Sequence, residues 1–500
     1  MNPQKKRSGN KNTRNTPARR WKSRISGPLT LLVTAFLVSG CASVGPNYIP
    51  PETKAPASWN TDLSAGLTGG TPDSNALARW WTTLGDPVLS DVIHQAVSGN
   101  LDVKTARSRI REARARRGIA AASRFPSLDA TGAYTKTRMS GNSSGVTGQT
   151  GLYSAEFDAA WEIDVFGGTR RSVEAADADL DAAGEDLHDT LVSLAAETAL
   201  NYVDTRTFQT RLTAAESNLD LQKQTYELTQ YRYRAGLSDD LAVSQARYNL
   251  ETTRSQIPTL RSGLSEAMNR LSVLTGQPPG TLNKTLAKHL PIPVTPPTVA
   301  VGVPAEALRQ RPDVRKSERA LAAQTARIGE AVADLYPKFT LTGSIGLESV
   351  SSGDLLTAGS RVWRYGPGVS WQVFDADAIR QNIKVQSALQ EQALIQYESA
   401  VLTALEEAEN ALNAFVEEQQ RRDALTRAVS AATQAARLAE DKFSGGLSDF
   451  STVLEAQRSL VSLQDQLGQS DGAVASNLIR IYKALGGGWT HLNDELQISN

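Results

Sequence analysis

The sequence predicts a mixed fold in which long α-helices are joined to four strands of a membrane β-barrel. Three observations favour this class. The chain contains one unit twice, each copy holds two segments of alternating apolar and polar residues, and each copy holds a helical stretch of more than sixty residues. No globular core is as long as such a helix. An elongated molecule is therefore expected.

The first 40 of the 500 residues are typical of an export signal. Nine basic residues and no acid precede residue 41, and the apolar stretch 29–38 is too short to span a bilayer as a helix. We therefore expect residues 1–40 to be a signal peptide that is removed.

Cys41, the one cysteine of the chain, directly follows this segment. The sequence Val38-Ser39-Gly40-Cys41 resembles a bacterial lipobox, in which the thiol is acylated before cleavage and becomes the new N-terminus. The alternative is a chance cysteine beside an ordinary cleavage site. Ala42 in place of aspartate indicates the outer membrane by the sorting rule of such lipoproteins, and the acyl chains would anchor the mature terminus there.

Composition excludes several classes of function. Without the nine leader cations the chain has 44 basic and 53 acidic groups, so a nucleic-acid partner is not expected. The four histidines, His94, His188, His289 and His491, lack metal-ligand spacing, and one cysteine cannot build a disulfide framework or a cysteine metal cluster. We expect no metal site, no cofactor apart from the lipid on Cys41, and no enzymatic activity.

The internal repeat defines the organisation of the chain. An offset of 211 residues aligns Phe125-Pro126 with Tyr336-Pro337, and an offset of 210 aligns Gly236-Leu237-Ser238-Asp239 with Gly446-Leu447-Ser448-Asp449. The predicted segments are a lipid anchor and N-terminal part (41–99), repeat 1 (100–276), a Pro-rich connector (277–310), repeat 2 (311–486) and a C-terminal tail (487–500).

Each repeat begins with a helix and continues with a strand pair. The helical stretches 101–122 and 312–333 end before Phe125-Pro126 and Tyr336-Pro337, because proline disfavours continuation of a helix. Apolar and polar residues then alternate, as in Phe157, Ala159 and Trp161 against acids, which is the period of a strand.

These strands fit a membrane barrel, with lipid outside and water inside, although a half-buried soluble sandwich remains the alternative. The aromatic residues expected at the membrane interface are Tyr153, Trp161, Trp363, Tyr365 and Trp371. Four strands cannot close a barrel, and open edges are not tolerated in hydrocarbon. Strands must therefore be pooled between chains; two chains would give eight strands and three would give twelve.

The rest of each repeat is predicted to be a long helical hairpin. The stretches 171–233 and 380–443 contain no proline and little glycine, and at 1.5 Å per residue each forms a rod of about 95 Å. Each rod turns at a glycine pair or Ala-Gly and returns along 239–274 or 449–485. The turns are expected at the end remote from the strands, which gives the outline of a tunnel; an ordinary coiled-coil stalk is the alternative.

Four motifs, taken in order, resemble the outer membrane efflux factors of the TolC/NodT type, lipoprotein branch. They are Cys41-x-x-Val44-Gly45-Pro46-Asn47-Tyr48, Trp80-Trp81-x-x-Leu84-Gly85-Asp86-Pro87, Arg311-Pro312-Asp313-Val314-Arg315 and Tyr482-Lys483-Ala484-Leu485-Gly486-Gly487-Gly488-Trp489. The resemblance covers residues 41–489.

The resemblance implies a homotrimer with a twelve-stranded barrel in the outer membrane and a helical barrel in the periplasm. It places residues 60–99, 277–310 and 487–500 around the middle. It also implies a passive exit duct for small molecules such as drugs, served by a periplasmic adaptor and an inner-membrane pump, often of the resistance-nodulation-division class. Metal ions and secreted polypeptides are alternative cargoes. A non-conducting structural coiled-coil lipoprotein is the alternative from another class.

The resemblance also implies a closed periplasmic end. In the family, the periplasmic tip is closed by one apolar and one acidic ring, with a nearby arginine, on the helix after the second turn. The matching positions here are Ser451, Glu455 and Arg458. Serine stands at the apolar position. An ordinary i,i+3 contact between Glu455 and Arg458 is the alternative.

The hairpin turns carry the residues expected to contact the adaptor. The alternative is that these residues only allow the chain to turn, which needs no partner. They are Gly236, Leu237, Ser238, Gly446, Leu447 and Ser448. Trp80 and Trp81 are expected to pack in the middle of the molecule rather than to bind cargo. His188 is expected on a solvated helix face.

Overall fold

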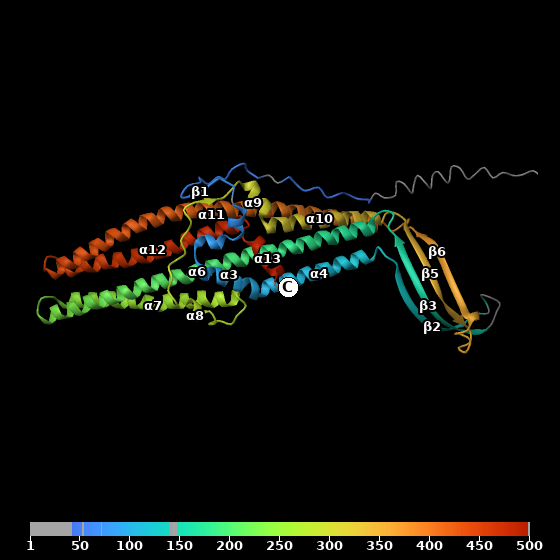
Figure 1. Cartoon of the computed structure of the whole chain (residues 1–500), viewed down its shortest axis with the longest axis horizontal. Helices are drawn as coiled ribbons and strands as arrows, with labels where there is room; N and C mark the ends of the chain where they lie inside the picture. The colour runs from blue at the N-terminus through green and yellow to red at the C-terminus, as the bar shows by residue number, and fades with distance from the viewer. Residues whose placement is uncertain (1–42, 53–54, 72, 141, 143–147, 499–500) are drawn as a thin grey trace, which may run out of the picture.

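The computed structural model describes residues 43–52, 55–71, 73–140, 142 and 148–498, with no description of the side chains of 495–498. The predicted signal peptide and Cys41 lie outside these residues. The molecule is elongated, with a β-sheet at one end, the turns of two helical hairpins at the other, and short elements around the middle (Figure 1).

The two repeats contain the same elements in the same order. Repeat 1 consists of α4 (Leu101–Ala122), β2 (Ser127–Arg138), β3 (Gln149–Ile163), α6 (Gly168–Arg234) and α7 (Asp240–Leu274). Repeat 2 consists of α10 (Pro312–Ala333), β5 (Lys338–Ser349), β6 (Arg361–Ser370), α11 (Ala378–Ser444) and α12 (Phe450–Ala484), with the 3₁₀ turn η2 (Ala358–Ser360) between its strands. Both long helices, α6 and α11, have 67 residues, so each is a rod of about 100 Å.

Glycine and capping residues set the boundaries of these helices. Gly236 and Gly446 have φ values of +73° and +74°, in the left-handed region where a side chain is disfavoured, and there the chain reverses direction. At the start of α7, Asp239 Oδ1 accepts a hydrogen bond from the N–H of Ala242 at 2.9 Å. The predicted and observed helix limits therefore agree to within about three residues.

The four long strands form one antiparallel sheet in the order β2-β3-β5-β6. The two repeats meet between β3 and β5, where Phe157 lies opposite Ile345. Each repeat fixes its strands to the preceding helix in the same way. Trp161 Nε1 donates to the carbonyl of Arg124 at 3.0 Å, and Trp371 Nε1 donates to the carbonyl of Leu335 at 3.1 Å. The sheet is thus held at a defined angle to the helical rods.

Neighbouring rods pack side by side along most of their length. α6 contacts α4, α7 and α10, whereas α11 contacts α10 and α12, and α12 also contacts α6. Among the described residues, none of the helices combines the length and the apolar character that a membrane-spanning helix needs.

The main core lies in the middle of the molecule. Short elements surround the rods there: β1 (Leu67–Thr68), α2 (Ser74–Ala78), η1 (Trp80–Leu84), α3 (Pro87–Gly99), α8 (Asn283–Leu286), β4 (Val299–Ala300), α9 (Pro304–Gln310) and α13 (Trp489–Ile498). Trp80 and Trp81 are fully buried, and Trp80 stacks on Tyr482 with 5.4 Å between ring centroids. The expectation that these tryptophans serve packing agrees with this position.

The expectation of a solvated His188 is wrong. Its side chain is only 17% exposed, its ring stacks on Trp489 with 4.1 Å between centroids, and its Nδ1 lies 3.1 Å from Glu185 Oε2. The sequence around His188 is charged, but α13 folds back from the C-terminus and covers this part of α6. The covering contact is tertiary, so the local pattern gave no sign of it.

The N-terminal segment runs in extended form along the rods towards the middle (Figure 1). The guanidinium of Arg171 donates hydrogen bonds to the carbonyl of Val44 at 3.1 Å and to Asn47 Oδ1 at 2.7 Å. Further along, the carboxylate of Glu409 accepts hydrogen bonds from the backbone N–H groups of Asn60 and Thr61 and from both their side chains. β1 then pairs in parallel with β4 of the connector.

Candidate functional site

The sheet has two chemically different faces. Exposed apolar side chains cover one face: Leu128, Tyr134, Phe157, Trp161, Ile163, Leu341, Ile345, Trp363, Tyr365 and Val369. By the alternation of the strands, the other face carries Asp129, Glu156, Asp158, Glu162, Lys338, Glu348 and Arg364. An apolar surface of this extent on a water-soluble chain is unusual, and it fits contact with lipid.

The charged face is internally paired. The guanidinium of Arg364 donates to Glu348 Oε1 at 2.8 Å and to Glu156 Oε2 at 3.2 Å, so one cation on β6 joins carboxylates on β5 and β3. Thr131 Oγ1 donates to Asp158 Oδ2 at 2.8 Å between β2 and β3. These contacts order the polar face across all four strands.

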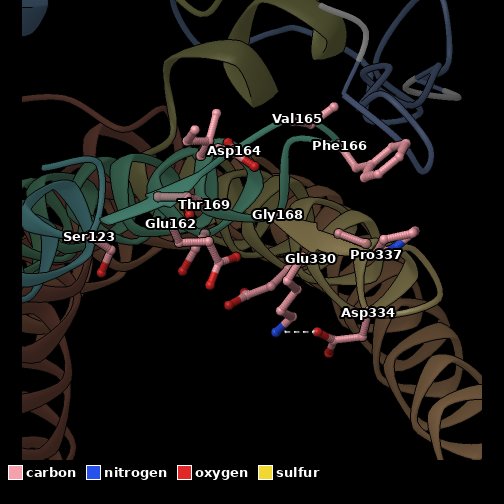
Figure 2. Close-up of a pocket in the computed structure, with 14 residues that line it drawn as sticks. Ser123, Glu162, Asp164, Val165, Phe166, Gly168, Thr169, Glu330, Asp334 and Pro337 are labelled. Atoms are coloured by element: carbon pink, nitrogen blue, oxygen red, sulfur yellow. Dashed lines mark ion pairs between the residues drawn. The ribbon is translucent and has the colours of Figure 1, made fainter. Parts of the chain in front are cut away.

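A polar cavity of about 400 Å³ lies where the sheet meets the helices. Figure 2 shows Glu162, Asp164, Glu330 and Asp334 around it, with an ion pair of 3.0 Å between Asp334 and Lys338. Asp164 Oδ2 accepts the N–H of Arg170 at 2.9 Å and so supports the first turn of α6. The cavity continues the charged face of the sheet towards the helical part.

The N-terminal segment begins beside this cavity. The N–H of Val44 donates to the carbonyl of Phe166 at 3.0 Å, and Ser43 lies so close to Gly167 that a side chain there would collide with it. Cys41, the predicted acylation site, is two residues before Ser43 and outside the described residues. The described chain therefore starts at the end of the sheet that adjoins the helices.

The two hairpin turns lie together at the far end of the molecule and enclose a cavity of about 590 Å³. Of the predicted contact residues, Leu237, Ser238, Gly446 and Ser448 line it, and Ser451 of the predicted gate does so too. Leu237 and Leu447 are 69% and 81% exposed. The structure thus brings both turns into one surface with two protruding leucines.

Sequence reasoning missed the side chains that hold the two turns together. Arg232 Nη1 donates to the carbonyl of Phe443 at 3.0 Å, and its guanidinium lies 4.4 Å from the centroid of the Phe443 ring. Phe443 and Phe450 pack edge to face across the second turn, 5.4 Å apart. The aromatic residues on either side of Gly445-Gly446 were the available signal in the sequence.

The predicted gate residues lie on the exposed side of α12. Phe450, Val453 and Leu454 form its buried side, whereas Ser451, Glu455 and Arg458 are exposed in the single chain. Arg458 does not pair with Glu455: its Nε donates to Asn249 Oδ1 at 3.3 Å, and its guanidinium lies 4.9 Å from the centroid of the Tyr248 ring on α7. Glu455 is exposed on the same side of α12 as Ser451.

Comparison with known proteins agrees with this geometry. The family model described as "Outer membrane efflux protein" matches residues 92–277 and 303–487, that is, both repeats. Nodulation protein T of Rhizobium leguminosarum bv. trifolii is 34% identical over 91% of this chain and 96% of its own length. The toluene efflux pump outer membrane protein TtgC of Pseudomonas putida is 30% identical over 92% of this chain and 95% of its own length.

The solved structures agree on the fold. The outer-membrane channel OprN matches with a TM-score of 0.84 and 34% identity, covering 90% of this chain and all of that one. The structure of CusC matches with a TM-score of 0.76 and 27% identity over 89% of this chain. A match of both repeats to the family model and near full-length similarity to these channels lead to one conclusion: the chain belongs to the outer membrane efflux protein family.

Proposed function

We propose that the protein is a passive exit duct in which three copies pool their sheets into a twelve-stranded barrel above a helical barrel. One observation carries this proposal: a four-stranded sheet with an apolar face, a charged face and two outer edges sits at the end of rods about 100 Å long. Lipid would cover the apolar face, and water would fill the space that the charged face encloses.

The energy and the docking would come from partner proteins. The paired turns, with Leu237 and Leu447 protruding, would contact a periplasmic adaptor, and the adaptor would connect the duct to an inner-membrane pump of the resistance-nodulation-division class. Acylation of Cys41 would fix the N-terminus to the outer membrane near the end of the sheet that adjoins the helices. In this arrangement the helical barrel extends into the periplasm.

Small organic molecules are the proposed cargo. TtgC is named for toluene efflux, and a further relative, ArpC of Pseudomonas putida, is named an antibiotic efflux pump outer membrane protein. CusC of Escherichia coli is named a cation efflux system protein, so metal ions are the second candidate. The amphipathic sheet argues against a non-conducting coiled-coil lipoprotein, because a stalk needs no such strands.

Planar-bilayer recording tests the duct and its gate. Purified, acylated protein should form channels. Glu455→Ala should raise their single-channel conductance, because the variant lacks the ring of three carboxylates that would bind cations and order water at the narrow point. Glu251→Ala, which removes an exposed carboxylate paired with Arg254 on α7, is the matched control. Unchanged conductance and selectivity in Glu455→Ala would contradict the assignment of Glu455 to a gate. Absence of channels in the wild type would contradict the proposal that the protein is a duct.

Site-directed crosslinking in intact cells tests the docking surface. Cysteine at Leu237 or Leu447 should form adducts with the adaptor, because both side chains project from the turns. Cysteine at Leu228, exposed on α6 but nine residues from Leu237, is the control and should give none. If the control crosslinks as well as the turn positions, the turns are not the docking surface.

A further inference from the structure

In repeat 2, part of the N-terminal segment lies in the groove between α10 and α11. Tyr48 Oη donates to Glu318 Oε1 of α10 at 3.1 Å. Pro46 and Pro51 line a cavity of about 380 Å³ together with Leu394 of α11. This groove therefore holds an extended stretch of polypeptide.

Four positions of α10 meet this segment: Glu318, Ala322, Thr325 and Gly329. At the last of them the two backbones touch, because a side chain on Gly45 would collide with the backbone of Gly329. The repeat offset of 211 residues places four residues of α4 at the same positions: Arg107, Arg111, Arg114 and Gly118. The outer side of α4 can therefore be compared with α10 residue by residue.

The matching groove of repeat 1, between α4 and α6, is open in the described part of the chain. By the repeat offsets, Ile110 of α4, and Leu180 and Gly184 of α6, correspond to residues that line the cavity in repeat 2. Ile110 and Leu180 are half-buried. A side chain added at Gly118 or Gly184 would meet no neighbouring group of the described residues within 4 Å. The groove thus has room for a chain that the described residues do not supply.

The two glycines leave helix backbone bare along this groove. Neither Gly118 nor Gly184 has the positive φ that would require glycine. A glycine inside a helix costs about 1 kcal/mol relative to alanine, and the described chain gains no contact in return. In repeat 2 the bare Gly329 is a place where an extended backbone packs on the helix. The same use is expected of the open glycines here.

Charge distinguishes the open groove from the filled one. Arg111 and Arg114 are exposed and Arg107 is half-buried, and none of the three forms an ion pair with another described residue. The three arginines span about 10 Å along α4. The equivalent positions of α10 carry no cation. A ligand of this groove would therefore be extended and negatively charged.

We propose that the groove between α4 and α6 docks an extended acidic polypeptide segment of a second protein. Its carboxylates contact Arg107, Arg111 and Arg114, and its backbone runs over Gly118 and Gly184. The groove lies on the outer side of the duct, because the N-terminal segment, which leads to the predicted lipid, occupies that side of repeat 2. This placement rests on the proposed function, whereas the binding itself does not.

The position of the arginines favours a polypeptide over a lipid headgroup. α4 ends at Ala122, so Arg111 and Arg107 lie about 16 and 22 Å along the helix from the sheet. The headgroup layer of a bilayer is only about 5–8 Å thick. Side chains of α4 also tilt towards its N-terminus, which is the end remote from the sheet. The cations thus extend into the aqueous compartment.

Fluorescence anisotropy with purified, acylated protein in detergent tests the charge. The probe is a labelled peptide of repeated proline-glutamate-glutamate units, as long as residues 46–51, because proline favours an extended backbone. It should bind the wild type, and Arg107→Gln with Arg114→Gln should weaken binding about tenfold. Arg116→Gln with Arg254→Gln removes the same charge from exposed ion pairs elsewhere and should leave the affinity unchanged.

Leucine substitutions test the shape of the groove. Gly118→Leu with Gly184→Leu should weaken binding about tenfold without any change in charge, because the new side chains fill the open space. Leucine favours a helix more than glycine does, so both helices should form. Thr252→Leu, at an exposed position of α7, is the control and should leave the affinity unchanged.

Three results would overturn the docking groove. They are no binding by the wild type, an equal loss in both pairs of charge variants, and an arginine effect without a leucine effect, which would mean non-specific attraction. Displacement of the peptide by short-chain phosphatidylglycerol, but not by short-chain phosphatidylcholine, would identify a lipid site instead and contradict the polypeptide.

Conductance in planar bilayers separates this inference from the proposed function. The groove variants should form channels with the conductance of the wild type, because the substituted side chains lie outside the duct. Absence of channels in every preparation would contradict the duct and leave peptide binding as a property of the groove. Channels without peptide binding would contradict the groove alone.

Discussion

Arg311, in the middle of the molecule, is a buried cation whose carboxylate partners are more exposed. Burial acts to lower the pKa of Arg311, but its hydrogen bonds and charge contacts with Asp313 and Glu407 outweigh burial and leave the pKa raised. Arg311 also donates to the carbonyl of Ala484 at 3.1 Å. One cation thereby joins the start of α10 to α11 and to the end of α12.

Asp471 is a half-buried carboxylate whose pKa is raised. Burial is the main cause, and the charge of Arg422 offsets it in part; both line a cavity of about 370 Å³ with His289. Because the native pKa exceeds that of the unfolded chain, ionisation of Asp471 lowers the free energy of unfolding at neutral pH. This cost disappears as the pH falls through the native pKa towards about 4.

Asp471→Asn should therefore raise the thermal midpoint at pH 7, and the gain should vanish near pH 4. Asp186→Asn is the opposite case. Burial pushes the pKa of Asp186 up, but Lys316 and Arg109 outweigh it and lower the pKa, so its ionised form stabilises the fold above about pH 4 and loses this effect in acid. Melting curves from pH 4 to 7 should give changes of opposite sign; equal signs would contradict this account.

At the scale of elements, the connector is held to the rods by a buried network on α6. Arg206 is fully buried and donates to the carbonyl of Lys288 at 2.8 Å, to Gln209 Oε1 at 2.8 Å and to Tyr202 Oη at 2.9 Å. Tyr202 Oη in turn donates to Asp86 Oδ2 at 2.6 Å. Two segments far apart in the sequence are thus fixed to one helix.

Arg206→Met should loosen the connector, because each buried polar group left unpaired costs about 1–3 kcal/mol. We expect faster proteolysis near Lys288 and a lower thermal midpoint. Arg211→Met, one turn further along α6, removes an ion pair with Asp465 that is partly exposed and worth about 0–1 kcal/mol. Equal sensitivity of the two variants would argue that the network does not hold the connector.

At the scale of the whole molecule, the charged face of the sheet determines what the proposed lumen attracts. Within the described strands it carries five carboxylates, Asp129, Glu156, Asp158, Glu162 and Glu348, against Lys338 and Arg364. Arg364 is shared by two of the carboxylates. The proposed barrel would therefore be lined with net negative charge, which favours cations.

Reversal potentials in a salt gradient should report this preference. Asp158→Asn combined with Glu162→Gln should lower the cation-to-anion permeability ratio, whereas Arg364→Gln should raise it. Lys136→Gln changes a charge on the other face of the same sheet and should leave the ratio unchanged. A ratio insensitive to all luminal changes would mean that selectivity arises elsewhere, for example at Glu455.

The sequence by itself determined the repeat, the alternation of the strands, the length of the rods and the turns between them. These features depend on local period and on proline and glycine, which act within a few residues. Only the tertiary structure decided which distant side chains meet. Arg458 contacts Tyr248 instead of Glu455, Trp489 covers His188, and Arg232 holds Phe443. The physical reason is that such contacts depend on how whole helices are rotated and packed against each other, and a local pattern identifies a face of a helix without identifying the neighbour that covers it.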